Sequence, residues 1–139
     1  MSFNNETGSH NSLLLFKKGD TPEFILKAIR EQNLRGLKIF SHLKEDRLPD
    51  LDFLKGCSFL EELDISSTQD YDFSFLMLLT KLKTLSISIE GNNVIDLSYQ
   101  KNLENLVIQW RKEKIVGLEH CKKLSTVGLY ASQTRYFVI

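Results

Sequence analysis

The sequence predicts an α/β fold in which short parallel strands stack beside one another as a solenoid, with helical, 3₁₀ or irregular turns on the convex side. Two observations support this prediction: leucine is very frequent, with 23 copies in 139 residues, and the leucines recur at a regular spacing along most of the chain. The composition is otherwise that of a folded domain, since 42% of the residues are hydrophobic and 26% are charged. Because one repeat cannot bury its apolar face alone, we expect about five to six repeats to stack around a shared core.

The strand half of the repeat is a leucine, then Leu or Val three positions later, then Ile or Leu two positions beyond. Successive copies are 26, 22, 21 and 21 residues apart, and they begin at Leu34, Leu60, Leu82, Leu103 and Leu124. Two further apolar columns precede the last four copies, at Leu54, Leu76, Leu97 and Leu118 and at Leu51, Phe73, Val94 and Ile115. Alternate residues of a strand face opposite sides, so the second leucine and the isoleucine of each copy should point inward.

This pattern resembles the leucine-rich repeat family over roughly residues 34–129. The resemblance implies a leucine-rich-repeat solenoid that acts as a protein-binding scaffold. The turn half of the repeat departs from the family, because the position that usually holds Asn or Cys is occupied by His42, Thr68, Glu90, Arg111 and Ser132. We therefore expect an irregular solenoid without the family's asparagine ladder.

The chain divides into a tail and one domain. Residues 1–11 are expected to be a disordered tail and residues 12–139 a single solenoid domain, with an N-terminal strand–helix cap at 12–33, repeats at 34–130 and a C-terminal edge strand at 131–139. The edge strand either folds over the last repeat or leaves an edge that another chain can use.

The N-terminal cap combines a strand at 12–17 with a helix at 22–32. Leu15 lies 22 residues before Leu37, so it should begin a degenerate repeat. The sequence Asp-Thr-Pro-Glu at 20–23 is typical of a helix start, with a capping oxygen, a proline in the first turn and an acid beside it. The helix should bury an apolar face made by Phe24, Ile25, Ala28 and Ile29.

Motifs for catalysis, nucleotide binding or metal binding do not occur, so we expect no enzyme activity, no cofactor and no metal. Cys57 and Cys121 occupy the same column three repeats apart, or about 14 Å. A disulfide needs Cα atoms within about 7 Å, so buried structural thiols are expected. His10, His42 and His120 are interpreted as surface residues.

Charge and targeting signals favour a soluble cytoplasmic protein. Eighteen basic and 18 acidic residues give a formal net charge of zero, which disfavours nucleic-acid or membrane partners. The N-terminus has no basic segment, and the apolar run at 13–16 is too short for a signal sequence or a membrane span.

The outward strand positions should form three columns on the concave face. These columns are Gly36, Glu62, Thr84, Asn105 and Thr126; Lys38, Asp64, Ser86, Val107 and Gly128; and Phe40, Ser66, Ser88, Gln109 and Tyr130. The candidate partner-binding residues are Glu62, Asp64, Ser86, Gln109, Trp110, Arg111 and Tyr130.

Two features of this face have alternative interpretations. Glu61, Glu62 and Asp64 form a carboxylate cluster with three interpretations: a solvated acidic patch, which is favoured, a contact for a basic partner, or a catalytic acid pair, which an open sheet face disfavours. The aromatic edge made by Phe40, Trp110 and Tyr130 contains residue types enriched at interface hot spots, but the phenylalanine and the tryptophan could instead fold inward as core.

These patterns favour a non-enzymatic protein–protein interaction module, most specifically a small immunity or inhibitor protein that neutralises a partner toxin or enzyme. It resembles bacterial toxin-neutralising proteins in size and in its lack of catalytic motifs. The alternative is a structural scaffold that self-associates through its C-terminal edge. The concave strip offers only about 400 Å², whereas a standard interface needs about 800 Å² per partner, so binding should recruit a flank at 110–114, 132–135 or 41–50.

Overall fold

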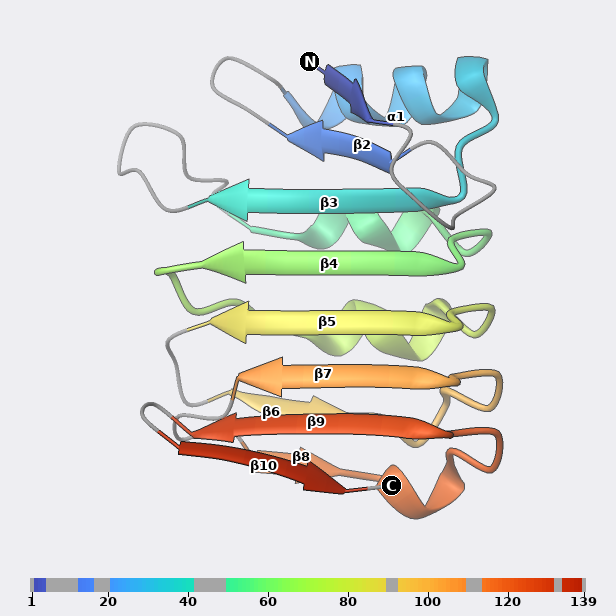
Figure 1. Ribbon diagram of the computed structural model, residues 1–139. Helices are drawn as coiled ribbons and strands as arrows, with labels where there is room; N and C mark the ends of the chain where they lie inside the picture. Colours follow the sequence, from blue (N-terminus) through green and yellow to red (C-terminus); the bar gives the residue numbers. More distant parts are fainter. Residues whose placement is uncertain are drawn as a thin grey trace.

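A computed structural model describes residues 2–4, 13–16, 21–41, 50–89, 93–109, 114–131 and 134–138. These residues form an α/β structure built on a mostly parallel sheet, with short helices behind it (Figure 1). The elements of the main sheet are β1 (Ser2–Asn4), β2 (Leu13–Phe16), β3 (Gly36–Ser41), β4 (Glu62–Ser67), β5 (Thr84–Ile89), β7 (Asn105–Gln109), β9 (Thr126–Ala131) and β10 (Thr134–Val138). The other elements are α1 (Pro22–Gln32), η2 (Asp52–Gly56), η3 (Ser74–Leu78), β6 (Val94–Asp96), β8 (Lys114–Val116) and η4 (Leu118–His120).

The sheet follows the order of the chain. Its strands are arranged β1-β2-β3-β4-β5-β7-β9-β10, and all neighbours from β2 to β9 are parallel. Parallel neighbours need a crossover: the one from β2 to β3 contains α1, and the later ones pass behind the sheet through a 3₁₀ turn or one of the short strands β6 and β8 (Figure 1). β1 and β10 pair antiparallel at the two ends of the described sheet.

The core lies between the sheet and these turns. In β4 and β5, buried and half-exposed residues alternate strictly, so the leucines, the isoleucines and Ser67 point inward while the other polar residues point outward. Leu63, Leu85 and Leu106 are successive register partners and each is at most 1% exposed. The inward leucine column therefore forms the continuous centre of the core, as the repeat predicted.

A repeated backbone pattern fixes the start of each strand. The carbonyl of Arg35 accepts hydrogen bonds from the amides of Glu61 and Glu62 at 2.8 and 3.1 Å. The same double acceptance recurs at the carbonyls of Glu61, Lys83 and Glu104, each one repeat further along. Because every repeat docks its strand on the previous one in the same way, the outward side chains keep one register.

The turns contain a column of buried residues at equivalent positions. Its members are Cys57, Leu79, Gln100 and Cys121, all buried, and the two thiols are free. The Gln100 side-chain amide donates to the carbonyl of Leu76, and the Cys121 thiol donates to the equivalent carbonyl of Leu97 at 3.5 Å. The prediction that both cysteines are buried structural thiols is confirmed.

The helix predicted at residues 22–32 is α1, and the capping signals explain its bounds. Thr21 Oγ1 accepts a hydrogen bond from the amide of Phe24 at 3.1 Å, and Pro22 lies in the first turn. The helix packs at the N-terminal end of the stack (Figure 1), with Ile25 and Ile29 in the core. Phe24 was wrongly assigned to this apolar face, because its side chain is 52% exposed.

Three further details differ from the sequence predictions. Ser2–Asn4 form β1 within the tail expected to be disordered, because they pair antiparallel with β2. The partner of Leu37 on β2 is Leu14 and not Leu15, so the register there is shifted by one residue. Val94 was predicted to share an apolar column with Leu51, Phe73 and Ile115, but it is 47% exposed while the adjacent Ile95 is fully buried, so Val94 is not a core residue.

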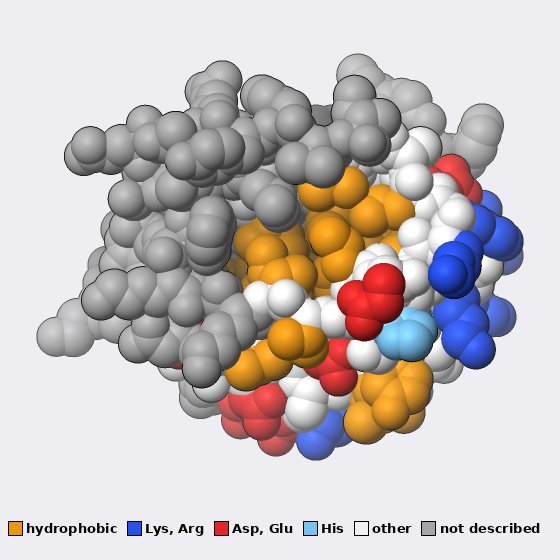
Figure 2. All heavy atoms as spheres, turned by 90° about the horizontal axis from the view of Figure 1, so that it is seen from below, with side chains coloured by type: hydrophobic (Ala, Val, Ile, Leu, Met, Phe, Trp, Pro, Cys, Tyr) orange, Lys and Arg blue, Asp and Glu red, His pale blue; other side chains and the backbone are white. Residues whose placement is uncertain are grey.

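The C-terminal end of the stack is formed by η4, β8, β9 and β10 (Figure 1). Viewed onto this end, hydrophobic side chains gather in the upper part of the described surface and again at its lower edge, acidic side chains and the histidine lie between them, and Lys and Arg gather along the right edge (Figure 2). In the last repeat Cys121 and Val127 are 7% exposed, while their counterparts Cys57 and Leu85 are fully buried. The predicted edge segment at 131–139 contains β10, which continues the sheet beyond β9.

Candidate partner-binding face

The sheet register produces the three outward columns predicted from the sequence. Glu62 pairs with Thr84, Asp64 with Ser86 and Ser66 with Ser88, and the same registers continue into β7 and β9. We call the sheet surface that bears these columns the open face. Its described side chains on β4 and β5 are half-exposed and mostly small, which leaves a shallow polar strip.

Asp64 is the most perturbed charge on the open face. Burial raises the pKa of its carboxyl, while the Lys38 ammonium and a hydrogen bond from Ser86 act in the opposite direction. Lys38 Nζ lies 3.9 Å from Asp64 Oδ2 on the neighbouring strand. The predicted site residues Asp64 and Ser86 are therefore in direct contact, and Lys38 completes their cluster.

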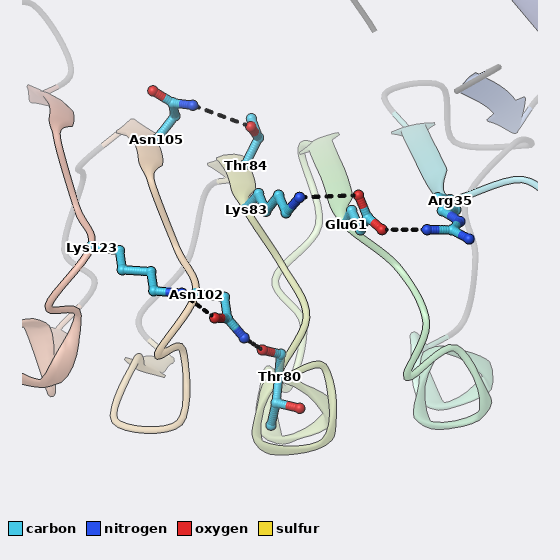
Figure 3. Close-up of polar contacts among 8 residues, drawn as sticks. All are labelled: Arg35, Glu61, Thr80, Lys83, Thr84, Asn102, Asn105 and Lys123. Atoms are coloured by element: carbon cyan, nitrogen blue, oxygen red, sulfur yellow. Dashed lines mark hydrogen bonds and ion pairs between the residues drawn. The ribbon is translucent and has the colours of Figure 1, made fainter. Parts of the chain in front are cut away.

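Glu62 lies beside Asp64 on the same strand, two residues away, so the two carboxylates share the open face. Glu61 is not part of this pair. It comes just before β4, and its side chain contacts residues that come just before the neighbouring strands. There its carboxylate accepts a hydrogen bond from Arg35 at 2.8 Å and lies 3.7 Å from Lys83 Nζ (Figure 3). The cluster of three carboxylates predicted from the sequence is therefore a pair on the face and one partnered edge residue.

The contacts of Glu61 are part of a polar edge that links successive repeats. Figure 3 shows Asn102 donating to the Thr80 carbonyl at 2.9 Å and accepting from Lys123 at 3.0 Å. Asn105 donates to the Thr84 hydroxyl at 3.4 Å. The hydrogen bond from Arg35 holds the pKa of the Glu61 carboxyl below its ordinary value, and Lys83 adds to this effect. This edge ties each repeat to the next beside the open face.

The third column leads toward the aromatic edge. Gln109 accepts a hydrogen bond from the Ser88 hydroxyl, which orients this predicted site residue across two strands. Phe40 is 52% exposed, so of its two interpretations the inward one is wrong. Val107 is 38% exposed in the middle column, so the open face also carries exposed apolar groups.

Other predicted positions are only partly described. Trp110 and Arg111 lie outside the described residues, as do residues 42–49 of the expected flank. For Tyr130 the structure gives the backbone, which pairs with Gln109 and Arg135. The structure therefore brings together Glu62, Asp64, Ser86 and Gln109 on one face.

Lys38 was not among the predicted site residues, although it stands in the same column as Asp64. The signal was present, because opposite charges at register positions of neighbouring strands are close enough to interact. Lys38 changes the chemistry of the site, since it supplies a cation within reach of Asp64.

The described residues contain no group of three or more His, Cys, Asp or Glu side chains that could hold a metal ion. In the same part of the chain, no helix has the length and apolar character needed to cross a membrane. Of the three histidines, His120 is described and exposed, with Nε2 3.6 Å from Glu119. Comparison with known proteins gave no match to any protein-family model, curated protein or solved structure.

Proposed function

We propose that this protein is a leucine-rich-repeat solenoid that binds another protein through its open face, and that it acts as a small cytoplasmic immunity or inhibitor protein. The observation that carries this proposal is the pair Glu62 and Asp64, held side by side on a sheet surface of small polar residues. It acts without catalysis, by covering a functional surface of its partner.

The raised pKa of Asp64 supports a binding role. Burial removes water from the Asp64 carboxylate, and the ion pair with the Lys38 ammonium compensates for only part of the lost solvation. A partner's lysine or arginine placed against Asp64 would add to the stabilisation of this carboxylate that Lys38 provides in part. The partner surface that fits is therefore basic.

The exposed apolar groups support an interface larger than the acidic pair. Val107 and Phe40 lie on the same face, in the second and third columns. Charges at the contact would steer association, and buried apolar groups would supply affinity. Recruitment of the flanks at 41–50, 110–114 and 132–135 would bring the contact toward the size of a standard interface.

The test is charge reversal on the open face. Glu62→Lys/Asp64→Lys should abolish capture of the partner from lysate of the source cells, with the captured protein identified by mass spectrometry. Glu23→Lys/Glu119→Lys is the matched control, because it changes the net charge equally at exposed positions away from the sheet. The wild-type protein should then inhibit the captured protein's own activity and bind it with a sub-micromolar Kd. Equal capture by both variants, or binding without inhibition, would contradict the immunity proposal.

The alternative is a scaffold that self-associates through its C-terminal edge. One observation favours it: β10 is the last strand of the described sheet and pairs on one side with β9. Light scattering over a range of protein concentrations tests this alternative. A mass that stays at 16.1 kDa would count against it.

A further inference from the structure

We propose a second docking site on the turn side of the molecule, which takes a partner peptide with one apolar side chain next to lysine or arginine. The site is a hollow of about 220 Å³ between η3 and β6, and it is independent of the open face. It is lined by Phe73, Met77, Val94 and Tyr99 together with Asp72, Ser74 and Asp96.

Three apolar residues in the wall of this hollow are about half exposed. Met77, Val94 and Tyr99 are 48%, 47% and 46% exposed, and Phe73 beneath them is buried. Met77 lies in η3, Val94 in β6 and Tyr99 in the turn that follows β6, yet all three line one hollow. Grouped exposed apolar side chains typically mark an interaction site, and Met and Tyr are enriched at interfaces.

The charge of the rim determines the kind of partner. Asp72 Oδ1 accepts a hydrogen bond from the Ser74 amide at 2.8 Å, and Asp96 Oδ1 accepts from the Ser98 amide and hydroxyl at 2.9 and 2.6 Å. These bonds fix both carboxylates in place, and those from Ser98 hold the pKa of Asp96 below its ordinary value. Among the described residues that line the hollow, Asp72 and Asp96 are the charged ones, so this rim is acidic and matches a cationic side chain, although His120 lies near enough to Asp96 to act on its charge.

The volume of the hollow favours a peptide side chain over a drug-sized small molecule. Pockets for drug-sized ligands have volumes of about 300–1,000 Å³, so this hollow is too small for them. It is large enough for one aliphatic or aromatic side chain. An apolar anchor in a pocket, flanked by charges at the rim, is the usual arrangement of a binding hot spot.

The experiment uses the methyl group of Met77. The chain has two methionines, so protein labelled with ¹³C-methyl methionine gives two signals, and Met77→Leu identifies one of them. The probe is the pentapeptide Gly-Lys-Leu-Lys-Gly, acetylated and amidated at its ends, added to the full-length protein. We expect the Met77 signal to shift in a saturable way. Replacing both lysines of the peptide by glutamate, or its leucine by serine, should weaken binding about fivefold or more.

Matched variants assign the effect to the rim. Asp72→Asn/Asp96→Asn keeps the oxygens that accept the turn hydrogen bonds but removes both charges, and it should weaken peptide binding about fivefold. Glu23→Gln/Glu31→Gln removes two exposed charges on α1, at the other end of the stack, and should change nothing. Asp64→Lys should also leave the peptide-induced shift of the Met77 signal intact, because Asp64 lies on the open face and not in the hollow. Failure of this proposal can therefore be distinguished from failure of the open-face proposal.

Three results would overturn the proposal. One is equal binding of the lysine and glutamate peptides. Another is a Met77 shift that follows protein concentration without peptide, which would assign the hollow to a second copy of the chain. The third is a nuclear Overhauser contact between the Met77 methyl group and residues 42–49 or 90–92, which would assign it to the protein's own chain.

Discussion

Asp64 lies directly across from Lys38 on the neighbouring strand, with 3.9 Å between Oδ2 and Nζ. This ion pair does not offset burial, because the pKa of Asp64 stays above its ordinary value. The folded state therefore binds a proton at Asp64 more tightly than the unfolded state does. The stability that Asp64 contributes is present at low pH and is lost as the pH rises through its folded pKa.

We expect Asp64→Asn to leave the free energy of unfolding at neutral pH unchanged, or to raise it by about 0.5 kcal/mol at most, because the side chain is 39% exposed and screened by water. The advantage of the variant should shrink as the pH falls through the folded pKa of Asp64, which burial holds above its ordinary value. Urea unfolding across this pH range measures both effects. Lys38→Gln is the companion variant and should destabilise the wild-type protein but not the Asp64→Asn background. A loss above about 1 kcal/mol in Asp64→Asn would show that the pair is structural.

Gln100 offers a second prediction, because Gln100→Met should stabilise the protein. The Oε1 atom of Gln100 is buried without a hydrogen-bond partner among the described residues, which costs about 1–3 kcal/mol. Methionine has a similar length and no polar group to satisfy. The Leu76 carbonyl would keep one donor, since it also accepts from the Leu79 amide at 3.1 Å. We therefore expect the free energy of unfolding to rise by about 1 kcal/mol in urea titrations.

The control for this prediction is Gln100→Glu, which keeps the length but adds a buried carboxyl and removes the amide donor. It should destabilise the protein by several kcal/mol at neutral pH and by less in acid, where the carboxyl is protonated. A loss of stability in Gln100→Met would contradict this prediction, and it would mean that the hydrogen bond from the Gln100 amide to the Leu76 carbonyl outweighs the cost of the unpartnered Oε1.

Much of the sheet could be predicted from the sequence because two periodicities agree. The repeat spacing set which strands pair, and the alternation within each strand set which side chains face outward, so the columns of Glu62 and Asp64 could be written down beforehand. The register of β2 could not, since its three consecutive leucines at 13–15 show no alternation and leave both faces apolar.

The turn side was less predictable for the same physical reason. Val94 and Ile95 are adjacent β-branched residues, and only the packing of β6 against β8 decides that Ile95 is buried. Met77 lies in a short 3₁₀ turn, where no period distinguishes an inward residue from an exposed one. The hollow lined by Met77 therefore required the three-dimensional structure, whereas the Lys38–Asp64 pair was already implied by the second column.

The two cysteines should react slowly with thiol reagents in the folded protein. Burial raises the pKa of the Cys57 thiol to about 11, against a smaller opposite effect from Arg30, and burial also raises the pKa of Cys121. Little thiolate is present at neutral pH, and reaction with dithiobis(nitrobenzoic acid) should be on the order of 100-fold slower than in unfolded protein. Cys121 should react before Cys57, because it is 7% exposed while Cys57 is fully buried. The variants Cys57→Ala and Cys121→Ala separate the two rates, and a fast phase from Cys57 would contradict its assignment to the core.

Substitution by alanine should have opposite effects on the free energy of unfolding at two glycines. Gly117 has φ = 82°, in the left-handed region, and an added Cβ would lie 2.8 Å from Ser98 Cα and closer still to Ser98 N. Neither atom can move away cheaply, because the Ser98 amide is held by Asp96. We therefore expect Gly117→Ala to lower the free energy of unfolding by about 2 kcal/mol or more.

Gly56 is the matched control at the end of η2, since no atom lies within 4 Å of its added Cβ and its φ is not positive. Gly56→Ala should be neutral or stabilise the protein by up to about 1 kcal/mol, because alanine restricts the unfolded chain. Urea unfolding of both variants, each with an unchanged m-value, measures the difference. The steric clash in Gly117→Ala would lie next to the hydrogen bond from the Leu97 amide to the Val116 carbonyl, which is 2.8 Å long. Relief of the clash should weaken this bond and loosen the last repeat against the preceding one. Faster labelling of Cys121 but not of Cys57 in Gly117→Ala would locate the loosening there, whereas equal acceleration of both would mean that the repeats unfold as one cooperative unit.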